Sequence, residues 1–454
     1  MTDLDEREIT ADDGNHPLTR GYWRAVQAWN RVLLIDPRNT EALKEICDLL
    51  TILSQWEPAR HYYENWLELD PNNVSALAGL GRVLQQLEMA DEAQQHYQRA
   101  LRLGRLKLVW VAIDLGNVYF DRERYEPAHD AYRDATWLDP ENSVAWRNLG
   151  LACEKLGKMD QSEEAHRKAV IADPEDEEAH YSLAWLLDRN GNVVEAESHY
   201  REAVRLDPDN AEYWRCLGSL LWNTDRLPEA EQALNRALQL APENHSVHVD
   251  LGITLSKAER FAEAEALFRR AMALAPEDPV AVYNLAYLYE QVGRPAEAEQ
   301  AYRDSIRLAP LVVRTYENLA NLLRDQQRYA EAEALYQRAL ELAPEQGTLF
   351  GNLGWQCYLQ GDYDRCIDVT RKGMGFEAST WWMPFNVALA LLADGQVEAA
   401  RAEYERTAAA CQRPKDLVAA LEDLEGLLRV RPELDAQGTI AGGLRDRLGE
   451  MDQD

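Results

Sequence analysis

The chain has 454 residues, of which 79 are acidic and 48 are basic, so its formal net charge at pH 7 is −31. Proteins that bind nucleic acid or anionic lipid present basic patches, so this charge argues against both kinds of partner. Hydrophobic residues make up 46% of the chain, which is enough to fold most of it. The sequence contains no apolar run of about 20 residues that would span a bilayer, and we expect no membrane partner.

Residues 1–17 are acidic, and we expect this segment to be disordered. It contains no apolar stretch of the kind that a secretory signal needs. The six cysteines form no C-x-x-C pair and fall within helical patterns, so we interpret them as buried thiols in a reducing compartment. These features predict a cytoplasmic protein.

From residue 18 onward the chain is periodic. A proline marks each repeat, and these prolines are Pro37, Pro71, Pro140, Pro174, Pro208, Pro242, Pro276, Pro310 and Pro344. Neighbouring prolines are equally spaced by about 34 residues, except that Pro71 and Pro140 are separated by two periods plus one inserted residue. A fixed period of this length indicates stacked supersecondary units and not one closed globule. Such arrays mostly present a long concave surface to other proteins.

Each period contains the pattern of two helices. The second helix carries a small residue, a bulky ring four residues later and another small residue three residues further on, as in Ala93, Tyr97 and Ala100. This spacing places all three on one helical face. The first helix carries a Leu–Gly or Leu–Ala pair, such as Leu319–Ala320. Proline cannot continue a helix, so it ends each second helix.

The pattern W-x2-L-G-x2-Y, then A-x3-F, then P, repeated at this period, resembles the tetratricopeptide repeat over roughly residues 18–412. The resemblance implies an all-α, right-handed superhelical solenoid of about eleven helix-turn-helix repeats. A leading helix from Thr19 to Asp36 precedes them, and residues 413–454 are expected to form capping helices and a tail. Ten full repeats are expected to begin near Thr40, Val74, Val109, Ser143, Glu177, Ala211, His245, Pro279, Val313 and Gly347, and a degenerate eleventh near Trp381.

Two junctions depart from the pattern. Around residues 104–108 the proline is absent and one residue is inserted. The repeat that begins at Gly347 has Cys366, Thr370 and Gly373 where a small residue, a ring and a small residue are expected, and its exit at residues 373–382 lacks the proline. We expect the stacking of repeats to be weakest at these two places.

One face of each first helix is expected to stay free of packing. The ring, Gly and Tyr positions of the pattern lie on one side of the helix, so the residue before the conserved Leu points to the opposite side. In the superhelix that the resemblance implies, this side lines the groove. The residue is asparagine in five repeats, namely Asn148, Asn284, Asn318, Asn352 and Asn386. An amide offers donors and an acceptor to a peptide backbone. The row is similar to the asparagine ladder of O-linked N-acetylglucosamine transferases.

Rings and polar groups flank these amides on the expected groove. The candidate peptide-binding residues are therefore Asn148, Asn284, Tyr287, Arg314, Asn318, Asn321, Asn352, Trp355, Trp382 and Asn386. The alternative is that asparagine is simply frequent at this position of the repeat family, and that Trp382 fills a gap at the degenerate junction. The N-terminal part of the groove is mixed and partly acidic around Asp114, so a partner segment with Lys or Arg suits it.

Three other patterns were weighed. Chaperone-binding members of the family clamp a C-terminal carboxylate, and Arg147, Asn148, Lys155 and Arg189 form a partial version, although surface charge explains them better. His245 and His248 lack a convincing third metal ligand, which favours structural histidines. The runs AEAEALF, AEAEQAY and AEAEALY are interpreted as solvated faces of second helices.

The sequence contains no nucleotide-binding, metalloprotease or nucleophile-elbow motif, so we expect no catalytic residue, no metal and no cofactor. The function we expect is that of a non-catalytic interaction scaffold, which holds an extended or helical segment of a partner protein in its concave groove. Two alternatives stay open. One is a structural subunit that self-associates or joins a larger assembly, and the other is a regulatory subunit or adaptor of a separately encoded enzyme. They differ in oligomeric state, which the sequence does not determine.

Overall fold

The computed structural model describes residues 17–104, 108–376 and 381–451, and every element in these ranges is a helix. Of residues 1–17, for which disorder is predicted, residues 1–16 lie outside the described residues, whereas Pro17 already belongs to the N-terminal helix. The parts of the two predicted weak junctions at residues 105–107 and 377–380 also lie outside the described residues. The helices are α1 (Pro17–Ile35), α2 (Thr40–Ile52), α3 (Trp56–Leu69), α4 (Val74–Gln86), α5 (Ala90–Leu103), α6 (Val109–Asp121), α7 (Tyr125–Leu138), α8 (Ser143–Lys155), α9 (Met159–Ala172), α10 (Glu177–Arg189), α11 (Val193–Leu206), α12 (Ala211–Asn223), α13 (Leu227–Leu240), α14 (His245–Lys257), α15 (Phe261–Leu274), α16 (Pro279–Gln291), α17 (Pro295–Leu308), α18 (Val313–Asp325), α19 (Tyr329–Leu342), α20 (Gly347–Leu359), α21 (Tyr363–Phe376), α22 (Trp382–Ala393), α23 (Val397–Ala410), α24 (Pro414–Val430), the short 3₁₀ helix η2 (Pro432–Asp435) and α25 (Thr439–Met451).

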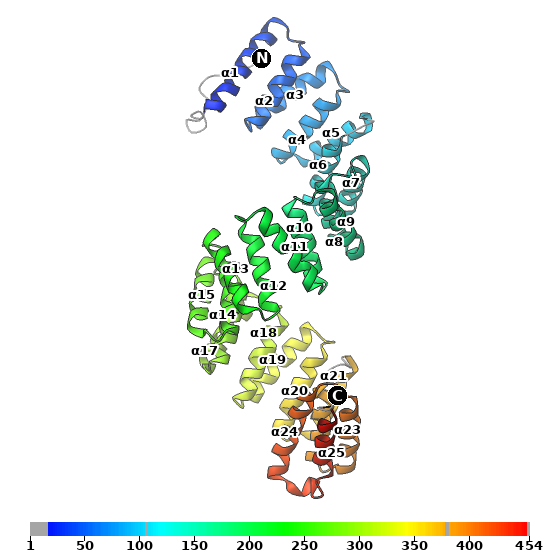
Figure 1. Ribbon diagram of the computed structural model, residues 1–454, viewed down its shortest axis with the longest axis vertical. Coiled ribbons are helices and arrows are strands. Elements are labelled where there is room, and N and C mark those ends of the chain that lie inside the picture. Colours follow the sequence, from blue (N-terminus) through cyan, green and yellow to red (C-terminus); the bar gives the residue numbers. More distant parts are fainter. Residues whose placement is uncertain (1–16, 105–107, 377–380, 452–454) are drawn as a thin grey trace. The chain divides into compact units, whose positions relative to one another are not determined.

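The predicted all-α solenoid is confirmed. The even-numbered helices from α2 to α20 begin at the ten residues predicted for the first helices (Figure 1). The chain forms two compact units, one that ends at Arg226 and one that begins at Leu227. Within each unit, a first helix packs against the odd-numbered second helix that follows it, and each helix hairpin packs on the next along the chain. None of the described helices combines the length and the apolar character that crossing a bilayer requires.

Local chemistry explains where the helices begin and end. Most first helices have an Asn or Asp cap, as at Asn73, whose side chain accepts the backbone N–H of Ala76. The turn to the second helix uses one residue with positive φ. That residue is glycine in several repeats, such as Gly293 at φ 71°, but Glu259 adopts φ 60° and Gln327 adopts φ 62°. Glycine takes this left-handed conformation without the steric cost that other residues bear.

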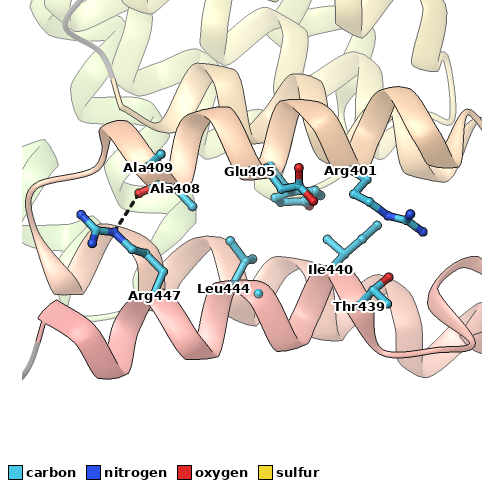
Figure 2. A pocket seen from close by; sticks show the side chains of 10 residues that line it. Arg401, Glu405, Ala408, Ala409, Thr439, Ile440, Leu444 and Arg447 are labelled. Carbon is cyan, nitrogen blue, oxygen red and sulfur yellow. Dashed lines mark hydrogen bonds between the residues drawn. The ribbon is translucent and has the colours of Figure 1, made fainter.

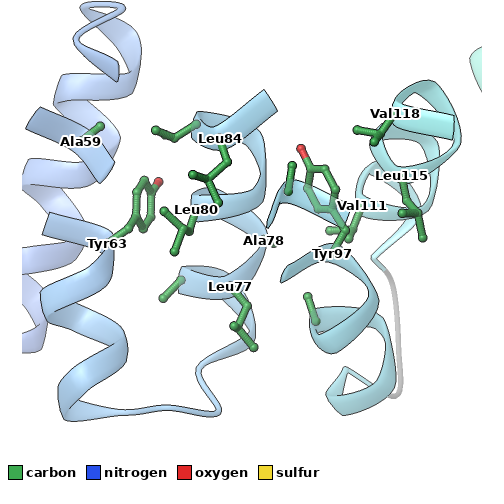
Figure 3. Close-up of a cluster of buried hydrophobic side chains, with 14 of the residues drawn as sticks. Ala59, Tyr63, Leu77, Ala78, Leu80, Leu84, Tyr97, Val111, Leu115 and Val118 are labelled. Carbon is green, nitrogen blue, oxygen red and sulfur yellow. The ribbon is translucent and has the colours of Figure 1, made fainter. Parts of the chain in front are cut away.

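The core consists of rings packed on small residues. Tyr97 on α5 lies so close to α4 that a Cβ added to Gly81 would stand 2.7 Å from its ring, and Phe268 lies 2.6 Å from the corresponding position on Gly252. Figure 3 shows Tyr63 and Tyr97 in this role, each between aliphatic side chains of neighbouring helices. The small residue in the first helix is therefore what allows the two helices of a repeat to approach closely.

An ion-pair ladder joins successive second helices. Arg260, Arg294 and Arg328, which stand just before second helices, each donate to a glutamate 29 residues earlier, and Arg226 does the same with Glu197. The interpretation of the AEAE runs as solvated faces is wrong for the second glutamate of each run. Glu299, for example, is 19% exposed and receives both Arg328 and Arg303.

Candidate interaction face

Three consecutive first helices of the second unit, α16, α18 and α20, expose the same side. In α18, Thr315, Tyr316, Leu319, Ala320, Leu322 and Leu323 are buried against neighbouring helices. The remaining positions face away from this packing, and α16 and α20 bury the same positions with few exceptions. The exposed side of these three helices is called the α16–α20 face below. It comprises Tyr283, Asn284, Tyr287, Arg314, Glu317, Asn318, Asn321, Asn352 and Trp355, all of which are at least partly exposed.

The ladder asparagines on this face bond to protein groups through their Nδ2 atoms. Asn318 Nδ2 donates to the hydroxyl of Tyr283 on the previous first helix at 2.8 Å. Asn352 Nδ2 donates to Glu317 Oε1, also on the previous first helix, at 2.8 Å. Asn284 Nδ2 instead donates to Val280 O of its own helix at 2.8 Å. Two of the three amides therefore link consecutive first helices.

The predicted neighbours of these amides occupy the same face. Tyr287 is 45% exposed, and the guanidinium of Arg314 lies 5.9 Å from the centre of the Tyr283 ring. Trp355 stacks on Tyr358 with 5.0 Å between ring centres. Asn321 is tied inward, since its Oδ1 accepts the hydroxyl of Tyr336 at 2.5 Å. The face thus presents aromatic rings and one cation between the amides.

Carboxylates on this side are largely engaged within the protein. Glu317 accepts Asn352, and Asp325 pairs with Arg324 at 2.8 Å. Glu290 accepts the hydroxyl of Tyr302 at 2.8 Å, and burial raises the pKa of its carboxyl. Arg314, in contrast, is exposed and pairs with no carboxylate in the described residues. In the described part of the chain, the face therefore carries one exposed cation without a carboxylate partner, beside carboxylates that already interact with side chains of the protein.

The prediction that Trp382 and Asn386 line the binding groove is wrong, because both side chains take part in packing within the protein. Asn386 is 8% exposed, and Leu389 on the same side of α22 is 2% exposed. The capping helix α24 packs on α22, and Arg431 at its end donates to Ala393 O at 2.6 Å. Trp382 packs over Gly351 of α20 and fills the space that a larger side chain would take. Accordingly, Asn386 and Trp382 belong to the packing of the cap and the junction.

The first unit carries the fifth ladder asparagine. Asn148 Nδ2 donates to Asn117 Oδ1 on the previous first helix at 3.2 Å, the same kind of link as in the second unit. Arg147 beside it is held by Asp176 and Glu178 at 3.1 and 2.6 Å, so it is already neutralised and does not serve a carboxylate clamp. Asp114 is likewise paired with Arg82 at 3.0 Å.

His248 and the six cysteines fill packing positions, whereas His245 is partly exposed and its Nε2 lies 3.2 Å from Asp278 Oδ2. His248 is buried and its Nδ1 lies 3.0 Å from Asn244 O, in agreement with a structural role. His180 Nδ1 and His199 Nδ1 lie 2.9 Å apart, so one of these atoms carries the shared proton. The six cysteines are buried free thiols, as predicted. Among the residues that the structure describes, no group of three or more metal-ligating side chains forms a metal site.

A cavity of about 200 Å³ lies between α23 and α25 in the C-terminal cap. Figure 2 shows Ile440 and Leu444 along its floor, with Arg401 and Arg447 near its two ends. Arg447 Nε donates to Ala408 O at 3.4 Å. Ligand pockets usually measure about 300–1,000 Å³, so this cavity is too small for a cofactor-sized molecule.

Sequence reasoning missed Tyr283 and Glu317, which accept the ladder amides. Both stand one position before the asparagine of their own repeat, so each lies 35 residues before its partner, one more than the period. The signal was a polar residue at this position in consecutive repeats. This polar residue can be assigned as a hydrogen-bond acceptor only when the tilt between neighbouring first helices is known, and the sequence alone does not give that tilt.

Comparison with known proteins gives a consistent result. Two family models, both described as tetratricopeptide repeat, match the chain: one at residues 113–177, 160–211, 181–245 and 249–312, the other at residues 73–138 and 311–368. Together these ranges cover more than half of the chain. No curated protein matches it.

Solved structures resemble the chain at low sequence identity. A tetratricopeptide repeat protein from Parabacteroides merdae is 17% identical with a TM-score of 0.48, and the match covers 55% of this chain and 98% of that protein. Yeast Tom70 is 16% identical with a TM-score of 0.46, over 90% of this chain and 99% of Tom70. The structure of the APC/C hetero-tetramer Cut9–Hcn1 gives 15% identity and a TM-score of 0.45, over 95% and 94%.

Proposed function

Because the chain belongs to the tetratricopeptide repeat family, whose fold is typical of non-catalytic interaction scaffolds and complex subunits, we propose that its α16–α20 face binds an extended segment of a partner protein. The observation that carries the proposal is the pair of pre-positioned amides at Asn318 and Asn352, one repeat apart, each tied through Nδ2 to the previous first helix. The partner segment would run along consecutive first helices and meet one amide in each repeat.

Fixing Nδ2 also fixes the position of the amide oxygen. An asparagine amide carries one acceptor oxygen besides its two N–H donors. With the amide plane held, the oxygen is ready to accept a peptide N–H, and little side-chain entropy is lost on binding. Each such hydrogen bond contributes about 0.5–1.5 kcal/mol net, so the amides alone do not supply micromolar affinity.

The remaining affinity is assigned to Tyr287, Arg314 and Trp355. Tyr, Arg and Trp are the residue types that dominate protein interfaces, because they bury a large area and keep a polar edge. Tyr287 is 45% exposed in the free protein and Arg314 pairs with no described carboxylate, so both are available to a partner. This arrangement favours a partner that supplies apolar side chains together with backbone polar groups.

The first unit is proposed to prefer a basic segment. Asp121 and Asp188 lie on the exposed side of α6 and α10, and neither forms an ion pair within the described residues. Burial raises the pKa of Asp188, which is expected of a carboxylate that lacks a compensating charge. A lysine or arginine of the partner would supply that charge. Arg189, whose guanidinium lies 4.5 Å from the centre of the Trp185 ring, would repel a basic segment. The preference for lysine or arginine is therefore proposed only beside Asp121 and Asp188.

A photo-crosslinking experiment tests the proposal. A photoreactive amino acid replaces Tyr287 on the face or, as the control, Gln300, which is exposed on the second helix α17. We expect a specific protein to be captured from native lysate at position 287 and not at position 300. Arg314→Ala should then reduce capture at 287, whereas Arg307→Ala, at an arginine that is also exposed but lies on a second helix, should not. Capture at position 300 alone would contradict the proposal and favour a structural subunit that assembles through its second helices.

A further inference from the structure

Helix α1 carries the pattern of a second helix, and no first helix precedes it among the residues that the structure describes, which begin at Pro17. In every complete repeat, the second helix buries three positions against its neighbours, for example Ala332, Tyr336 and Ala339 on α19, all 0% exposed. The same three positions are buried in each of the helices α3, α5, α7, α9, α11, α13, α15, α17, α19, α21 and α23. On α1 these positions are Ala25, Trp29 and Val32, and all three stay partly exposed. This side of α1 is therefore less covered than the same side of the other second helices, although Trp29 and Val32 still pack in part against the core.

This less covered side of α1 has the shape of a helix-packing surface. Counting 100° per residue from the buried Val26, the residues Gly21, Ala25, Ala28, Trp29 and Val32 fall between about 200° and 300°. These five residues are called the α1 open face. No heavy atom lies within 4 Å of the position of a Cβ on Gly21, whereas the first-helix glycines Gly81 and Gly252 are in tight contact with rings. Small residues beside one ring and one valine match the pattern that receives a first helix elsewhere in the chain.

The positive charge of α1 indicates what kind of helix could bind the α1 open face. The segment Pro17–Ile35 contains arginines and no acidic residue, although the chain as a whole has a net charge of −31. Arg24 and Arg31 fall at about 160° and 140° on the same count, at the edge of the open face beside Ala28. Both are exposed, and neither forms an ion pair within the described residues.

We propose that the α1 open face binds an amphipathic helix of a partner protein, with small residues on its apolar side and acidic residues along one flank. The bound helix takes the place that a first helix has in a complete repeat, and its acidic flank pairs with Arg24 and Arg31. A second copy of α1 fits less well, because an antiparallel pair would place the arginines of both copies along the same flank, where they repel one another. This site is separate from the α16–α20 face, so each proposal can fail alone.

The chain itself offers a probe. Residues 177–190 contain the first helix α10, which carries the Leu183–Ala184 pair and three acidic residues. A fluorescently labelled peptide of this sequence, added to the full chain, should show saturable binding by fluorescence anisotropy with Kd below about 1 mM. Absence of saturable binding in this range would overturn the proposal.

Three variants of the full chain locate the binding. Ala28→Glu places a charge on the open face at an exposed position and should weaken peptide binding by at least about tenfold. Gln27→Glu adds the same charge on the other side of α1 and should change it by less than about twofold. Arg24→Glu combined with Arg31→Glu should weaken binding by about fivefold. Equal effects of Ala28→Glu and Gln27→Glu would overturn the proposal, provided that circular dichroism shows both variants folded.

Analytical ultracentrifugation of the same samples tests whether a second copy of the chain, and not a partner helix, occupies the α1 open face. We expect the wild-type chain to have the same mass as the Ala28→Glu variant. A wild-type dimer that Ala28→Glu converts to a monomer would identify a second copy as the occupant and overturn the proposed partner helix.

Discussion

One double-mutant cycle tests whether the ladder asparagines stabilise the packing of neighbouring first helices. The alternative is that asparagine is frequent at this position of the repeat and contributes no stability there. Asn318→Ala removes the donor of the 2.8 Å bond to Tyr283, and Tyr283→Phe removes only the accepting hydroxyl. A hydrogen bond between neutral groups contributes about 1 kcal/mol net, so the two substitutions should be coupled by about that amount. In hydrogen exchange this corresponds to about a fivefold change in the opening equilibrium of the α18 amides.

Hydrogen exchange is the appropriate assay because repeat arrays open locally, so that one global unfolding energy is poorly defined. Asn284→Ala is the control, since its Nδ2 bonds within its own helix and its removal should leave the link between α16 and α18 intact. Substitutions at independent sites add to within about 0.3–0.5 kcal/mol. A coupling energy below that limit would refute the idea that the amides link neighbouring first helices.

Three further outcomes follow from the packing. Gly252→Ala should destabilise the chain by about 1–3 kcal/mol in urea unfolding, because its Cβ would stand 2.6 Å from a ring, whereas Gly426→Ala, with open space around it, should stabilise by about 0.5–1 kcal/mol; equal effects would contradict the close approach. The α20–α21 repeat should exchange its amides faster than the α18–α19 repeat, since Gln356 Oε1 is buried without a hydrogen-bond partner, and equal protection would count against this. Hydrogen bonds from Arg328 lower the pKa of Glu299, so its contribution to stability is present above the ordinary glutamate pKa and is lost as the pH falls through its lower folded-state value; a Glu299→Gln variant should show a smaller loss over that range.

Most of the fold could be predicted because one period controls it. The first-helix starts follow from the constant proline spacing and from Asn or Asp caps such as Asn73 and Asp176, which are visible in the sequence. The ring and small positions follow from spacing on a single helix. The ion-pair ladder was also visible in principle, since its arginines recur once per repeat and its glutamates precede them by 29 residues. The pairing of these arginines and glutamates could not be predicted, because it depends on the distance between second helices of neighbouring repeats.

The candidate site was less predictable because its residues act between helices. Asn318 occupies the same position of the repeat as Asn386, yet the first links two first helices and the second is buried beneath the cap. The difference arises from α24, which packs on α22 as consecutive first helices of the array do on one another, while α25 packs on α23.

This placement of the cap sets the length of the proposed binding face. At the positions that other first helices leave open, α22 presents Leu389 and Leu392, which are 2% and 0% exposed. Apolar residues there would be costly if solvated, and α24 covers them. The proposed face therefore ends at α20. Four ladder asparagines were predicted in the second unit, but only Asn284, Asn318 and Asn352 are accessible to a ligand. A partner segment that follows the ladder must leave the array beside Trp355, so crosslinks introduced at α22 should capture no partner while those at Tyr287 do.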